Sequence, residues 1–158
     1  MMAVNMHNGD ELRDLYRELI LDHSRNPRHF GRMHDATHAA DGINPLCGDK
    51  LRLYLRVDEG AIASSSFEGT GCAISVASAS LMTDAVIGSP VDRAEACFEA
   101  VTSRLTGDQG KPDIPDGMEK LKALDGVREY PMRVKCATLA WHALRAALEG
   151  EGATAKTE

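Results

Sequence analysis

The strongest constraint on the fold of this chain is an alternation of apolar and polar residues over positions 51–57. Every second residue is apolar: Leu51, Leu53, Leu55 and Val57. A period of two is typical of a strand that buries one face. Residues 58–60 (Asp-Glu-Gly) favour a turn, so 61–68 is predicted to return as the antiparallel partner. With a short strand over 37–43, the sequence predicts a small antiparallel sheet of about three strands.

Helical periodicity dominates the rest of the chain. The predicted helices are residues 10–24 before the sheet and, after it, a small-residue helix that starts near Cys72, one that opens at Ser89-Pro90, a short one over 118–124 and a last one that opens at Pro131. A Gly- and Pro-rich loop spans 106–117. A sheet followed by helices indicates an α+β fold. We expect residues 1–158 to form a single domain, with 1–8 and 150–158 disordered.

Composition excludes several classes of function. The formal net charge of −6 argues against a nucleic-acid binder, which normally carries a basic patch or stripe. No run of eighteen apolar residues exists, so we expect no membrane span. The first residues lack the basic and apolar regions of a signal peptide. The expected location is therefore the reducing cytoplasm, where cysteines bind metal or react more often than they pair.

Cys47 and Cys72 are predicted next to the ends of secondary-structure elements, and each allows a structural or a functional interpretation. Cys47 is predicted on a turn, where Gly48 lets the carboxylate of Asp49 approach the same point. An ordinary turn explains this stretch equally well. Cys72 follows two glycines at a predicted helix start, where unpaired N–H groups favour a thiolate. A small apolar residue at a helix start is the plain alternative.

The other two cysteines both belong to predicted helices. Cys136 lies early in the last helix beside Arg133 and Lys135, whose charges should lower its pKa and offset an anionic metal site. A buried structural cysteine is the alternative there too. Cys97 borders an apolar stripe and is expected in the core. No C-x-x-C pair marks a zinc ribbon, although three thiolates and one carboxylate satisfy four-coordinate zinc.

Three long motifs, in this order, resemble one family. They are NPLCGD (44–49), FEGTGCAISVASASLMT (67–83) and PMRVKCATLAWHAL (131–144), and the segment LYRELILDHSRNPRHFG (15–31) is also similar. The chain is identified from them as similar to the SufU proteins, within the IscU-like group of iron–sulfur cluster assembly proteins. The resemblance covers nearly the whole chain and implies the SufU/IscU-like fold.

Two features place the resemblance on the SufU side of this group. IscU scaffolds have a histidine immediately before the third cysteine, where this chain has Lys135. The segment between the second and third cysteines is also longer in SufU proteins. Here 63 residues (73–135) separate Cys72 from Cys136.

The resemblance implies a specific chemistry. SufU-like proteins bind one Zn²⁺ through the residues matching Cys47, Asp49, Cys72 and Cys136. They accept persulfide sulfur from a SufS-type cysteine desulfurase, a pyridoxal-phosphate enzyme, and pass it to the downstream Suf cluster assembly machinery. The residue matching Cys47 is the acceptor, which makes the protein a sulfurtransferase. Two alternatives remain open: a scaffold for a [2Fe–2S] cluster on the same cysteines, and an adaptor in which zinc is only structural.

Overall fold

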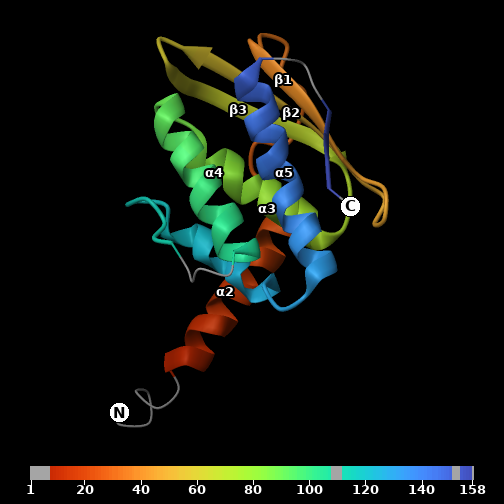
Figure 1. Cartoon of the computed structure of the whole chain (residues 1–158), viewed down its shortest axis with the longest axis vertical. Helices are drawn as coiled ribbons and strands as arrows, with labels where there is room; N and C mark the ends of the chain where they lie inside the picture. The colour runs from red at the N-terminus through yellow and green to blue at the C-terminus, as the bar shows by residue number, and fades with distance from the viewer. Residues whose placement is uncertain (1–7, 108–111, 151–153, 158) are drawn as a thin grey trace.

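The computed structural model describes residues 8–107, 112–150 and 154–157, and it has the predicted α+β architecture (Figure 1). The elements are, in chain order, α2 (Asn8–Arg25), β1 (His38–Asn44), β2 (Asp49–Asp58), β3 (Ala61–Thr70), α3 (Ala73–Val86), α4 (Val91–Thr106), the 3-10 helix η1 (Glu119–Val127), α5 (Pro131–Glu149) and β4 (Thr154–Lys156). None of the helices in these ranges is long and apolar enough to cross a membrane.

The sheet follows the alternation in β2. Its strand order is β3-β2-β1-β4, and β2 pairs antiparallel with both β1 and β3, as predicted. Leu53 is fully buried and lies between Ala40 of β1 and Phe67 of β3. Burial of these three side chains on one face of the sheet stabilises the fold by roughly 25 cal/mol for each Å² of apolar surface removed from water.

The C-terminal segment differs from the prediction of a disordered tail. Residues 154–156 form β4, which pairs parallel with β1. The Thr157 N–H donates to the Ile43 carbonyl at 3.0 Å, and its hydroxyl donates to the Lys135 carbonyl at 3.2 Å. Backbone pairing at a sheet edge needs no apolar pattern, so this strand could not be predicted from the sequence. The remaining residues predicted to be disordered lie outside the described ranges, except Asn8, which begins α2, and Gly150, which follows α5.

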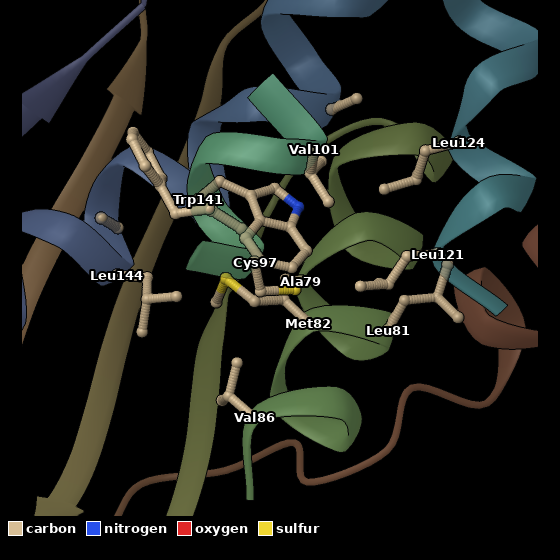
Figure 2. Packing of buried hydrophobic residues seen from close by; sticks show 14 of the residues in the cluster. Ala79, Leu81, Met82, Val86, Cys97, Val101, Leu121, Leu124, Trp141 and Leu144 are labelled. Carbon is tan, nitrogen blue, oxygen red and sulfur yellow. The ribbon is translucent and has the colours of Figure 1, made fainter. Parts of the chain in front are cut away.

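The core lies between the sheet and the helices. Trp141 of α5 is fully buried, and its Nε1 donates to Ser78 Oγ of α3 at 3.1 Å. Small residues on α3 allow this close helix packing. Cys97 lies among these apolar side chains, as Figure 2 shows, and is fully buried. Burial raises the pKa of its thiol to about 12, which confirms the prediction that Cys97 is a core residue.

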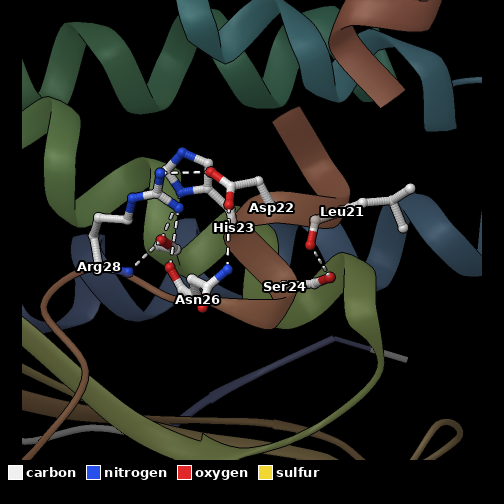
Figure 3. Close-up of polar contacts among 7 residues, drawn as sticks. Leu21, Asp22, His23, Ser24, Asn26 and Arg28 are labelled. Atoms are coloured by element: carbon white, nitrogen blue, oxygen red, sulfur yellow. Dashed lines mark hydrogen bonds and ion pairs between the residues drawn. The ribbon is translucent and has the colours of Figure 1, made fainter. Parts of the chain in front are cut away.

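A polar network joins the end of α2 to α3. His23, in the last turn of α2, is only 1% exposed. Its Nδ1 lies 2.6 Å from Ser80 Oγ, which also accepts the Arg28 N–H at 2.8 Å. An ion pair between Arg28 and Asp22 also ties the segment that follows α2 to that helix (Figure 3). The sequence could not show this burial because it depends on packing against a helix more than fifty residues away.

Candidate metal centre

The loop between β1 and β2 presents Cys47. Asn44 and Asp49 pair across the ends of these strands, so four residues (45–48) make the connection. Gly48 has φ +71°, a left-handed conformation that glycine adopts without steric cost. Cys47 is exposed, and so is the neighbouring Leu46. The prediction that Cys47 lies on a surface turn is confirmed.

Asp49 is the buried acid of the centre. It is the first residue of β2 and has no exposed surface. Its Oδ1 accepts the backbone N–H of Cys72 at 2.9 Å, and its Oδ2 lies 3.9 Å from Cys72 Sγ. A Cβ on Gly71 would lie 2.8 Å from Asp49 Oδ1, which is closer than Cβ atoms approach. Because Gly71 has no side chain, the Asp49 carboxylate has room to occupy this position.

Cys72 caps the N-terminus of α3, where the sequence predicted a helix start. Its Sγ accepts the backbone N–H of Ser75 at 3.4 Å, in the manner of an N-cap side chain. The thiol is exposed. The N-terminal end of a helix carries a partial positive charge that favours negative charge on this sulfur.

Cys136 supplies the buried thiol. It is 3% exposed on α5, and its Sγ lies 3.6 Å from Cys47 Sγ. Burial raises the pKa of the Cys136 thiol well above its ordinary range, and contacts with Asp49, Cys72 and Cys47 raise it further. A bound cation reverses this preference, because a coordinating thiol loses its proton.

Contrary to the prediction, Arg133 and Lys135 do not bring the pKa of the Cys136 thiol below its ordinary value. Burial raises the pKa of the thiol, whereas these cations were expected to lower it. The Arg133 guanidinium lies over the ring of Tyr130, 4.8 Å from its centroid. Lys135 lines a cavity on another side of α5. Lys135, directly before Cys136, is rotated about 100° away from it around the helix.

The ligand atoms converge as a zinc site requires. One ligand atom from each of Cys47, Asp49 and Cys136 lies within 4.8 Å of the others, and Cys72 lies beside Asp49. In a tetrahedron with Zn–S bonds of about 2.3 Å, two sulfurs are about 3.8 Å apart. The observed separation of 3.6 Å is close to this value and far too long for a disulfide. The donor set therefore fits zinc, and the assignment of four ligands stays a prediction.

Asn44 is a residue of the centre that the sequence did not single out. It is fully buried, and its Nδ2 lies 4.0 Å from Cys136 Sγ. Its Oδ1 accepts the backbone N–H of Leu46 at 3.2 Å. Asn44 thus links the Cys47 loop to the buried thiol. Its position directly before Pro45 was the available sign, since asparagine often bonds to the backbone two residues on.

Most of the chain is similar to known proteins of iron–sulfur cluster assembly. Residues 15–150 match the family described as NifU-like N terminal domain. The chain is 41% identical over 130 residues to the zinc-dependent sulfurtransferase SufU of Bacillus subtilis (strain 168), covering 82% of this chain and 86% of that protein. It is 40% identical over 139 residues to the iron–sulfur cluster assembly scaffold protein IscU of Streptococcus pyogenes serotype M1, covering 88% and 86%.

A solved structure extends this similarity to the fold. The crystal structure of a putative iron–sulfur cluster assembly scaffold protein for the SUF system, from Fervidobacterium islandicum AW-1, superimposes with a TM-score of 0.73. The two chains are 32% identical, and the match covers 83% of this chain and 94% of that one.

Proposed function

The chain belongs to the family of NifU-like N-terminal domains, in the SufU/IscU group of iron–sulfur cluster assembly, and from this premise we propose that it is a zinc-dependent sulfur acceptor. Its donor is a SufS-type cysteine desulfurase, a pyridoxal-phosphate enzyme. The acquired sulfur passes to the Suf cluster assembly machinery of the cytoplasm. The protein acts as a sulfurtransferase in this scheme.

One observation carries the proposal: an exposed cysteine lies beside buried metal-ligand candidates. Cys47 is exposed on a loop, whereas Asp49 and Cys136 are buried in a strand and a helix. A structural zinc site is normally closed by four rigid ligands. Cys47, on a loop, can dissociate from the metal with less rearrangement of the fold than the two buried residues can. This asymmetry suits a site in which one ligand also reacts.

The reaction follows from the chemistry of the Cys47 thiolate. Zinc, when bound, keeps the coordinating thiols deprotonated at neutral pH. The Cys47 thiolate attacks the outer sulfur of the persulfide on the desulfurase cysteine. The donor S–S bond breaks, a new S–S bond forms on Cys47, and the donor cysteine leaves as a thiolate. No net oxidant is needed, because the persulfide oxidation level moves from one cysteine to the other.

The remaining groups have supporting roles. Asp49, Cys72 and Cys136 are the residues that would retain the metal while Cys47 reacts. Asn44 positions the loop through its bond to Leu46 and its contact with Cys136. Cys47 is itself exposed, so the sulfur of a partner protein can reach it.

Stimulation of a SufS-type desulfurase by Cys47→Ala tests the proposal. We expect the variant to abolish stimulation, since the acceptor thiol is missing. Cys97→Ala is the matched control: it removes a buried core thiol that is not among the candidate ligands and should stimulate as the wild type does. Full stimulation by Cys47→Ala would overturn the acceptor role.

A scaffold for a [2Fe–2S] cluster is the second candidate, favoured by the 40% identity to a protein named as a scaffold. Thiolates bind such clusters as well as zinc. Lys135 stands against it, because the resemblance to scaffolds calls for histidine there. Anaerobic reconstitution that yields one stable visible-absorbing cluster per chain would favour the scaffold. A purely structural zinc predicts instead that chelation unfolds the domain and that Cys47 never carries sulfur.

A further inference from the structure

A cavity of about 480 Å³ lies against α5, lined by neither Cys47, Asp49, Cys72 nor Cys136. Its wall includes the end of α4 at Leu105, five α5 residues, and Thr157 of the C-terminal segment. The α5 residues that matter here are Val134, Lys135 and His142. This volume falls within the range of roughly 300–1,000 Å³ typical of small-molecule sites.

The cavity is separate from the metal centre because of helix geometry. Lys135 and His142 are seven residues apart, about two helical turns, so they share one side of α5. Cys136 is rotated by about 100° from Lys135 around the same helix. The two sites therefore lie on different sides of one helix.

The described residues that line this cavity carry positive charge without a balancing carboxylate. Arg128 and Lys135 both line it, and the described lining residues include no carboxylate. Arg128 donates one hydrogen bond to the Gly107 carbonyl at 3.2 Å, and no acceptor among the described residues takes its other guanidinium N–H groups. The only hydrogen bonds of Lys135 among the described residues, apart from those of the helix, are to its backbone carbonyl, from Thr138 and Thr157. Its ammonium group thus has no carboxylate partner there.

We propose that this cavity binds a small phosphomonoester. The phosphate contacts Arg128 and Lys135, and the organic part packs on the apolar wall at Leu105 and Val134. A phosphomonoester carries a charge of about −1.5 to −2 at pH 7, which matches the two cations. Arginine recognises phosphate through paired N–H donors, and lysine supplies a point charge. The inference rests on this cavity alone and is independent of the sulfur-acceptor function.

Titration of the purified full chain with three probes tests this proposal: phenyl phosphate, inorganic phosphate and phenol. We expect phenyl phosphate to bind most tightly, inorganic phosphate more weakly, and phenol not measurably. Backbone amide NMR shifts should cluster at Thr138 and His142 rather than at Cys47, which separates the cavity from binding at the metal centre. Absence of phenyl phosphate binding at millimolar concentration would overturn the proposal.

Charge-removing variants complete the experiment. Arg128→Gln and Lys135→Gln should each weaken phenyl phosphate binding by on the order of tenfold, as expected for a charged hydrogen bond. Lys120→Gln, on the exposed surface of η1, is the matched control and should bind as the wild type does. Thermal unfolding verifies that each variant is folded. Unchanged affinity in the Arg128→Gln/Lys135→Gln double variant would equally overturn the assignment.

Discussion

Cys47 Sγ and Cys136 Sγ lie 3.6 Å apart although 89 positions separate them in sequence. One thiol belongs to an exposed loop and the other to a buried helix face. The pair joins the two halves of the fold at one point, because the β1–β2 loop meets the first turns of α5 there. Its separation is close to the roughly 3.8 Å expected between two sulfurs on one zinc ion and is far too long for a disulfide.

Gly71→Ala should weaken zinc binding although it replaces none of the candidate ligands. The new Cβ would lie 2.8 Å from Asp49 Oδ1 and 3.2 Å from Ser75 Oγ, so the carboxylate must move. Displacement of a group that orients ligands typically lowers metal affinity by about 10–100-fold. Competition with a chromophoric chelator measures this affinity. Gly126→Ala, which meets nothing within 4 Å, should bind zinc as the wild type does; equal affinity of all three proteins would contradict the account of Gly71.

Arg104→Met should destabilise the fold strongly. Arg104 pairs with Asp125, with side chains 8% and 18% exposed, and also donates to the Pro112 carbonyl at 2.6 Å. Removal of one partner of a buried pair costs roughly 3–5 kcal/mol. Arg145→Met is the control, because it breaks an exposed ion pair with Glu149 and should lower the free energy of unfolding by less than about 1 kcal/mol. Urea unfolding of the two variants measures both losses. Similar losses in the two variants would show that burial of the Arg104 pair contributes little.

Stability should fall as the pH drops below about 6.5, partly through His23. Burial lowers the pKa of His23 from its ordinary value of 6.5, so the folded chain holds this ring neutral. Just below pH 6.5, the His23 ring binds a proton in the unfolded chain but stays neutral in the folded chain. The contribution of neutral His23 is thus present above that pH and is lost as the pH falls through the folded-state pKa.

Variants isolate this contribution from other titrating groups. His23→Asn keeps an acceptor near Ser80 Oγ but cannot titrate, so its free energy of unfolding should fall less than that of the wild type between pH 7.5 and 5.5. His34→Asn changes an exposed histidine and should lose as much stability as the wild type. Identical pH dependence in His23→Asn and the wild type would remove His23 from the explanation.

The sequence predicted those parts of the fold that depend on local pattern. The alternation at Leu51, Leu53 and Leu55 was sufficient to predict β2 and its two antiparallel partners, and Pro131 marked the start of α5. β4 was missed because its three residues pair only through backbone groups with β1. The burial of His23 was missed because it depends on Ser80, 57 positions away.

The local positions of the candidate ligands were predictable from the sequence, but the way they meet was not. The turn at Gly48 and the helix start at Cys72 could be read locally. Their meeting with Cys136 rested on the family resemblance, since no local pattern relates residues so far apart. The effect of Arg133 and Lys135 was misjudged because burial outweighs their charge at the Cys136 thiol.

Mass spectrometry of the protein after incubation with a SufS-type desulfurase and cysteine tests the central claim most directly. The Cys47 peptide should gain the mass of one sulfur atom, and a reductant should remove it. Cys97→Ala should be modified on Cys47 in the same way, whereas Cys47→Ala should carry no added sulfur. Stimulation of the desulfurase with no added sulfur on Cys47, or with the sulfur on Cys72 or Cys136 instead, would contradict the account.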